Sequence, residues 1–180
     1  MKKVLICLLI SLVFCGCGKI IKETELKEEK NDYKNLKSIT IDGINIQTML
    51  DITNDNDITE YIESKTKNTY RFIYKDGSIT EEDYKNLIQY LYDECYGYDS
   101  YLGVININED IGNYEIFYKK SKTDGKAVKV EIKESIKDSK SIYEISYSLV
   151  DYDGDVIYMR YIGNNNGVEQ YDYDESCVNK

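Results

Sequence analysis

Hydrophobic and polar residues alternate through much of the second half of the chain. In residues 143–149, Tyr, Ile, Tyr and Leu alternate with Glu, Ser and Ser. Successive side chains of a strand point to opposite faces of a sheet, so this pattern predicts a strand with one buried and one wet face. Patterns of this kind predict strands at residues 101–107, 113–118, 127–132, 141–150 and 156–162.

The segment after residue 80 has the spacing of an amphipathic helix. Thr80 and Asp83 resemble a capping box, which starts a helix. Apolar residues then recur every three or four positions, as in a helix that packs one face on a core. The members of this stripe are Tyr84, Leu87, Ile88, Leu91 and Cys95.

Turn signals predict a hairpin earlier in the chain. Residues 38–46 carry alternating β-forming residues on both sides of Asp42 and Gly43, a dipeptide that favours a type I′ turn. A further strand is predicted at residues 70–74, whereas residues 48–68 show only a weak helical pattern.

These elements predict an α+β fold in which one main helix packs on an antiparallel β-meander, preceded by a β-hairpin. We expect a single domain over residues 38–180, with an acidic, tyrosine-bearing tail from residue 169. The length of 180 residues suits one core of this kind.

The composition excludes several classes of function. The chain has no His, so it cannot form a Ser-His-Asp triad, a Cys-His pair or a zinc site with histidine ligands. Its 33 acidic and 23 basic side chains give a net charge of −10, which argues against a nucleic-acid partner. No glycine-rich phosphate loop occurs. We therefore expect no cofactor and no enzyme of these classes.

The N-terminal residues have the pattern of an export signal. Lys2 and Lys3 precede the apolar run Val4–Phe14. A membrane-spanning helix needs about 20 apolar residues. The run is too short for that but has the length of the apolar part of a signal peptide.

This run ends in small residues and a thiol, with Gly16 directly before Cys17. The segment resembles the lipobox of bacterial lipoprotein precursors, in which a small residue precedes the cysteine that is lipidated. The resemblance implies a signal peptide at residues 1–16 and a diacylglyceryl thioether on Cys17, which becomes the new N-terminus. The acyl chains would hold the protein on the extracytoplasmic face of the cell membrane. Residues 17–37 would then form the lipidated end and a charged tether.

Tyrosine is unusually abundant, with 19 residues. Because its ring is rigid and amphipathic, an exposed row of tyrosines on a sheet suits the binding of sugars or peptides. We favour the plainer interpretation, in which tyrosine fills half-buried faces of the sheet. The ligand-binding candidates on predicted strands are Tyr143, Tyr147, Tyr158 and Tyr161.

An acidic segment invites a calcium interpretation. Asp51, Asp55 and Asp57 place carboxylates at alternate positions, as an EF-hand loop does. However, Asn56 replaces the turn glycine of such a loop, and Ile62 stands where its bidentate Glu belongs. We favour solvated turns and no metal here.

Cys95 and Cys177 lie beyond the signal peptide and the anchor. Outside the membrane they could form a disulfide, which would stabilise the fold by roughly 4–5 kcal/mol because it closes a long loop. We favour the alternative of a buried Cys95 and a free Cys177, because a loose tail is poorly suited to disulfide geometry.

The sequence favours a lipid-anchored protein of the cell envelope. Its domain is expected to be a non-catalytic binding or accessory domain, with an envelope glycan, a peptide or a protein as its partner. One alternative is a calcium-assisted adhesion module. Another is a glycoside hydrolase with two catalytic carboxylates, but the sequence singles out no such pair.

Overall fold

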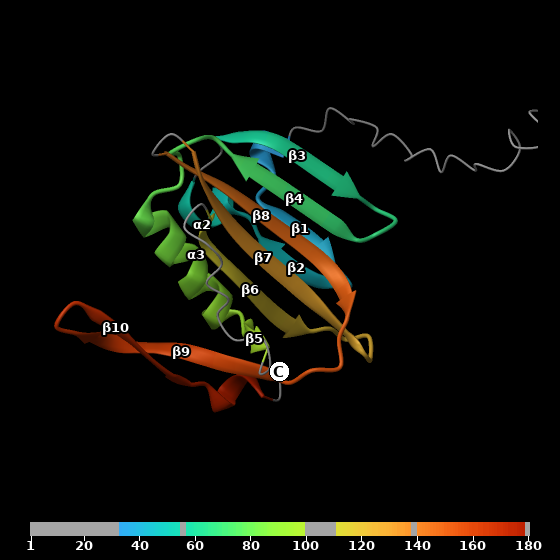
Figure 1. The fold of residues 1–180 in the computed structure, drawn as a ribbon. Coiled ribbons are helices and arrows are strands. Elements are labelled where there is room, and N and C mark those ends of the chain that lie inside the picture. The colour runs from blue at the N-terminus through green and yellow to red at the C-terminus, as the bar shows by residue number, and fades with distance from the viewer. Residues whose placement is uncertain (1–32, 55–56, 100–110, 138–139, 179–180) are drawn as a thin grey trace, which may run out of the picture.

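The computed structural model describes residues 33–54, 57–99, 111–137 and 140–178 (Figure 1). Strands make up 55% of the structure and form two sheets. In chain order the elements are η1 (Tyr33–Asn35), β1 (Ser38–Ile41), β2 (Ile44–Gln47), α2 (Met49–Thr53), β3 (Ile58–Ser64), β4 (Thr69–Tyr74), α3 (Glu81–Asp93), β5 (Gly97–Asp99), β6 (Ile111–Lys120), β7 (Lys126–Lys137), β8 (Lys140–Asp151), β9 (Val156–Asn165), β10 (Val168–Tyr173) and η2 (Glu175–Cys177).

The predicted fold class, a helix packed on a β-meander, is wrong. The protein is mostly β, with an eight-stranded antiparallel sheet in the order β10-β9-β5-β6-β7-β8-β4-β3 and a separate β1–β2 hairpin. The prediction relied on the tendency of consecutive strands to pair. Here β4 pairs with β8, and β5 lies between β6 and β9. Residues 58–64, from the segment with a weak helical pattern, form β3, and the strand predicted at residues 101–107 lies outside the described residues.

The predicted hairpin turn and the predicted start of the helix are both confirmed. Asp42 and Gly43 both have positive φ angles, 49° and 75°, and they join two strands that pair from Ile41↔Ile44 outward. At the start of α3 the backbone N–H of Asp83 donates to Oγ1 of Thr80 at 3.1 Å, and the N–H of Thr80 donates to the Asp83 carboxylate at 2.9 Å. Both signals depend on neighbours in sequence, which is why the sequence could predict them.

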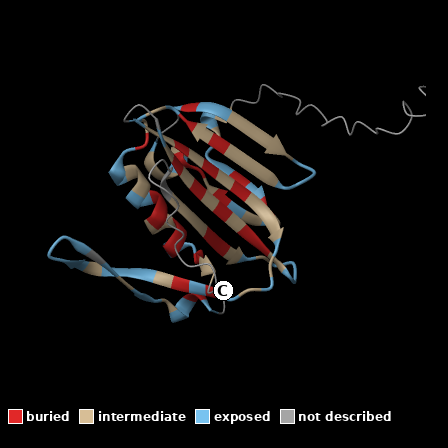
Figure 2. Ribbon diagram, viewed as in Figure 1, coloured by how far each residue is buried: buried red, intermediate tan, exposed pale blue. Residues whose placement is uncertain are grey.

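The main core lies where one face of the large sheet meets α3 and the β1–β2 hairpin (Figure 2). Leu87 and Leu91 of α3, Val130 and Ile145 of the sheet, and Ile46 of β2 are each no more than 1% exposed. Burying a side chain of this size contributes about 1.5–3 kcal/mol. A smaller second cluster forms on the opposite face of β6, because successive residues of a strand point to opposite faces.

The fold begins before the expected boundary at residue 38. The ring of Tyr33 stacks on that of Tyr61, with centroids 5.7 Å apart, and Leu36 packs against the main core. Thr48 donates a hydrogen bond to the carbonyl oxygen of Leu36 at 2.6 Å. The last residues of the expected tether are therefore part of the domain. Cys17 lies outside the described residues, and no helix within the described ranges is long and apolar enough to cross a membrane.

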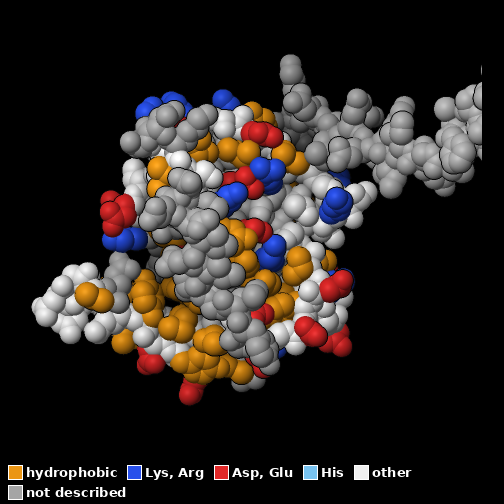
Figure 3. All heavy atoms as spheres, in the orientation of Figure 1, with side chains coloured by type: hydrophobic (Ala, Val, Ile, Leu, Met, Phe, Trp, Pro, Cys, Tyr) orange, Lys and Arg blue, Asp and Glu red, His pale blue; other side chains and the backbone are white. Residues whose placement is uncertain are grey.

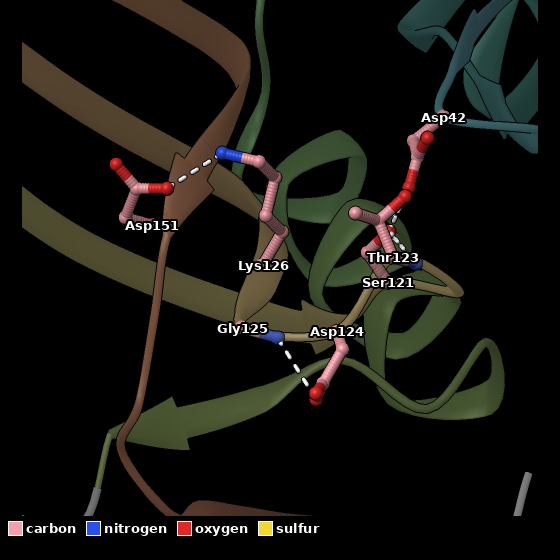
Figure 4. Close-up of polar contacts among 7 residues, drawn as sticks. All are labelled: Asp42, Ser121, Thr123, Asp124, Gly125, Lys126 and Asp151. Carbon is pink, nitrogen blue, oxygen red and sulfur yellow. Dashed lines mark hydrogen bonds and ion pairs between the residues drawn. The ribbon is translucent and has the colours of Figure 1, made fainter.

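The turn between β6 and β7 fixes the small hairpin to the large sheet (Figure 4). Ser121 donates a hydrogen bond to the carboxylate of Asp42, at the tip of the β1–β2 hairpin. At the end of the same turn, Nζ of Lys126 lies 2.6 Å from the carboxylate of Asp151 on β8. These contacts hold one end of the domain together through polar groups, of which Asp42, Ser121 and Lys126 are half-buried and Asp151 is exposed.

Candidate functional site

A hairpin of β9 and β10 projects from the body of the molecule, and we call residues 156–178 the arm (Figure 1). Asn166 and Gly167 form its turn, with positive φ angles of 53° and 85°. Positive φ at both central residues is the signature of a type I′ turn, whose twist matches that of the flanking strands. The side chain of Asn164 accepts a hydrogen bond from the N–H of Gly167 at 2.8 Å and closes the turn.

The arm joins the body through the three residues of β5. Residues 97–99 pair with residues 156–158, and from Met159 outward β9 pairs only with β10 within the described part of the chain. Gly97 permits this close approach, because a Cβ there would press on the carbonyl oxygen of Ile157 and lie 2.7 Å from Cγ1 of Val156. The outer part of the arm is thus a two-stranded ribbon.

A disulfide between Cys95 and Cys177 fastens the base of the arm. Both residues are buried in the second cluster, with 4% and 3% exposure. The interpretation that we favoured, a free Cys177 in a loose tail, is wrong in the structure. β10 returns the chain to the body, where the N–H of Asp174 donates to the carbonyl of Tyr158 at 3.0 Å. The even number of remaining cysteines was the signal for this pair.

Exposed apolar side chains gather on the arm. Seven large hydrophobic side chains are exposed in the described residues, and six of them belong to the arm. The seventh, Ile136, lies on β7. The arm is mostly exposed along its length (Figure 2), and hydrophobic side chains line the lower edge of the molecule (Figure 3). The six are Ile157 (40%), Tyr161 (42%), Ile162 (54%), Val168 (66%), Tyr173 (44%) and Val178 (50%).

The outer strand of the arm is also an open edge. β10 is the last strand of the sheet, so no strand of the described residues pairs with its outer side. Unpaired N–H and C=O groups along an edge can pair with another chain. The register shifts between Gln170 and Tyr171, which leaves Ile162 of β9 without a partner residue. Such a bulge bends and twists a strand. A two-stranded ribbon is only marginally stable in water, and a further strand would stabilise it.

The four tyrosines considered as weak ligand-binding candidates do not form one exposed row. Tyr143 and Tyr147 are buried in the main core, with 7% and 1% exposure, and Tyr158 is buried in the second cluster. Only Tyr161 is exposed on the arm, where its ring lies 5.7 Å from that of Tyr171. Sequence reasoning missed the neighbouring apolar residues of the arm. The sequence did contain a sign of them, because apolar residues occur at both odd and even positions of the last strands and therefore on both faces of the sheet.

Of the weak candidates for calcium ligands, the two in the described residues each face a lysine of their own. Asp51 lies 3.7 Å from Nζ of Lys37, and Asp57 lies 3.8 Å from Nζ of Lys75. Asp55 lies outside the described residues. Across the ranges that the structure describes, no three His, Cys, Asp or Glu residues form a group that could hold a metal ion.

The hydroxyls of Tyr84, Tyr98 and Tyr114 offer no general base near neutral pH. Burial, together with the hydrogen bond to Glu131, raises the pKa of Tyr114 to about 12. Burial likewise raises the pKa of Tyr84 and Tyr98, and the nearby charge of Glu115 raises both further. These hydroxyls therefore stay protonated at neutral pH and act as hydrogen-bond donors.

No family model, no curated protein and no solved structure matches the chain. The functional argument therefore depends on the residues themselves. Among them, the arm departs most from what an isolated domain needs, because in the described residues it exposes apolar side chains and an open strand edge together.

Proposed function

We propose that the protein is a cell-envelope lipoprotein, anchored through Cys17, whose domain is a non-catalytic docking module. Its arm would bind an extended strand of a partner protein that carries apolar and basic side chains. The observation that carries this proposal is the gathering of six exposed apolar side chains on the arm, whose outer part is a two-stranded ribbon with an open edge.

Strand addition explains the edge and the apolar side chains together. A partner strand would satisfy the free backbone groups of β10, and its side chains would cover apolar residues such as Val168 and Tyr173. Burial of apolar surface supplies the affinity at about 25 cal/mol per Å² before the costs of association. A third strand would also give the ribbon the width that stable sheets need.

Charge favours a basic partner. Asp172, Asp174 and Glu175 follow one another closely at the return of the arm. Arg160 lies 3.9 Å from the carboxylate of Asp172. With a chain charge of −10, a second copy or an anionic lipid surface would bring like charges together. A strand with Lys or Arg beside its apolar residues would instead be attracted.

The test measures binding of a defined peptide to the chain from residue 17 onward with its disulfide intact. The probe is a fluorescent eight-residue peptide of alternating Val and Lys. We expect saturable binding that Val168→Asp or Ile162→Asp weakens about tenfold, which is about 1.4 kcal/mol. Ile136→Asp is the matched control, because Ile136 is equally apolar and 47% exposed but lies outside the arm. Equal binding by all the variants would overturn the arm as the docking surface.

Two further probes separate the elements of the proposal. A Val–Lys peptide methylated at alternate backbone nitrogens keeps its side chains but cannot pair along an edge, and we expect it to bind at least tenfold more weakly. A Val–Glu peptide tests the charge argument and should not bind.

Sedimentation of the chain alone should show a monomer. A dimer that Val168→Asp dissociates would replace the partner strand with a second copy.

A further inference from the structure

A separate hollow lies between α3, β5, β6 and β10. Its volume is about 430 Å³, within the range of small-ligand sites. Tyr84 and Tyr92 of α3, Tyr98 of β5, Glu115 of β6 and Tyr171 of β10 line it. We call it the tyrosine groove. The arm forms one of its walls through Tyr171, whose ring centroid lies 5.3 Å from that of Tyr92.

Glu115 is the polar centre of the tyrosine groove. One of its carboxylate oxygens accepts a hydrogen bond from Tyr84 at 2.6 Å, and the other accepts one from Tyr98 at 3.1 Å. The hydroxyls of Tyr92 and Tyr98 lie 3.0 Å apart and extend the network. The hydroxyl groups fix the position of the carboxylate, but they are neutral donors and leave its charge uncompensated.

A second carboxylate on the neighbouring strand shows what Glu115 lacks. Glu131 of β7 also accepts a tyrosine hydroxyl, from Tyr114 at 2.5 Å, and it forms an ion pair with Nζ of Lys129 at 2.8 Å. No Lys or Arg of the described residues forms such a pair with Glu115. Carboxylates that are partly removed from water usually have a cationic partner.

We infer that the tyrosine groove binds an organic cation, a primary ammonium or a guanidinium, whose charge faces Glu115. Carboxylate oxygens have lone pairs for further hydrogen bonds, so Glu115 can accept from the ligand while Tyr84 and Tyr98 hold it. The faces of the tyrosine rings attract a cation and cover its carbon stem. This inference does not depend on strand docking at β10, because a small free cation could occupy the groove alone.

The test compares two matched ligands by calorimetric titration of the disulfide-bonded chain. N-acetylarginine amide carries the charge, and N-acetylcitrulline amide has nearly the same shape without it. We expect saturable binding of the arginine compound and binding at least tenfold weaker for the citrulline compound. Equal binding of the two compounds, or none of either, would overturn the inference.

Variants of the chain locate the site. Glu115→Gln should weaken binding of the arginine compound about tenfold, since it removes the charge and keeps the shape. Glu131→Gln is the matched control, because that carboxylate already has Lys129 as its partner, and its affinity should equal that of the parent. The opposite result, with loss in Glu131→Gln only, would place the site elsewhere.

Lys85→Gln gives a test of opposite sign that does not disturb the hydrogen bonds of Glu115. Lys85 lines the groove and forms an exposed ion pair with Glu81 at 3.0 Å. Removing this positive charge should tighten binding of the arginine compound about twofold, and weaker binding would count against a cation in the groove. Val168→Asp, at the open edge, should leave cation binding unchanged. Failure of strand docking and failure of the cation site are therefore distinguishable.

Discussion

Cys95 ends the turn after α3 and is bonded to Cys177 at the return of the arm, 82 positions later in the chain. Cys95 has a positive φ of 60°, and its N–H donates to the carbonyl of Tyr92 while that of Tyr96 donates to Leu91. This pair of bonds is a Schellman motif, which ends a helix with a left-handed residue. The helix end therefore directs the thiol toward the arm and sets where the arm is fastened.

Removal of this disulfide should destabilise the whole domain. Closing a loop of 82 residues restricts the unfolded chain and is worth about 4–5 kcal/mol in the chain-entropy description. We expect the double variant Cys95→Ser/Cys177→Ser to lose about this much free energy of unfolding in urea titrations. A reductant should lower the stability of the parent to the same extent and leave the variant unchanged. A parent that is insensitive to reductant would contradict the expectation.

Gly97→Ala should loosen the arm at its base. The new Cβ would press on the carbonyl oxygen of Ile157, and relieving that contact should cost about 1–3 kcal/mol, as overpacking usually does. Hydrogen exchange should then quicken at the amides of β5 and β9. Gly77→Ala is a suitable control. The φ of 68° at Gly77 would strain an alanine, but nothing lies within 4 Å of the Cβ position there. That variant should lose stability without faster exchange in the arm.

The sequence predicts the helix and the first hairpin well, but it does not predict which distant strands pair with each other. Helix α3 and the β1–β2 hairpin follow from residues a few positions apart, and the chemistry of their ends is local. The pairing of Gly97 with Tyr158, or of Phe72 with Ile145, joins distant segments and leaves no local pattern. The burial of a tyrosine is hard to predict for the same reason. Tyr147 and Tyr161 both lie on strands, but the first is covered by another layer of the fold and the second is not.

The contact between the small hairpin and the large sheet should depend on pH (Figure 4). Hydrogen bonds from Ser121 and then Thr123 lower the pKa of Asp42 below its ordinary value. A carboxyl with a lowered pKa in the folded state stabilises the fold above its unfolded pKa, about 3.9 for Asp. This stabilisation is lost as the pH falls through the lowered value.

Ser121→Ala tests this dependence, because it removes the first of these donors. We expect a difference in unfolding free energy between parent and variant at pH 6 that shrinks as the pH falls below about 4. Thr66→Ala, in the exposed turn between β3 and β4, is the control and should show no such trend. A difference that is constant from pH 6 to pH 2 would show that the Asp42 charge plays no part.

Cys17→Ala should abolish lipid attachment if the lipobox assignment is correct. The variant removes the thiol that would carry the diacylglyceryl group, while the apolar run Val4–Phe14 stays intact. Metabolic labelling with a radioactive fatty acid should mark the parent and leave the variant unmarked. Replacing Cys15, which also lies before the domain, provides the matched control and should leave labelling unchanged. Labelling that persists in Cys17→Ala would refute the anchor.

A chain that begins at residue 38 should be less stable than one that begins at residue 33. The shorter chain loses the stack of Tyr33 on Tyr61 and the packing of Leu36 against the core. It also leaves the hydroxyl of Thr48, a residue that is only 1% exposed, without the carbonyl of Leu36 as acceptor. A lost buried hydrogen bond alone costs about 1–3 kcal/mol, so the free energy of unfolding should fall by at least that amount. Equal stability of the two chains would return residues 33–37 to the tether, and the domain would then begin at β1.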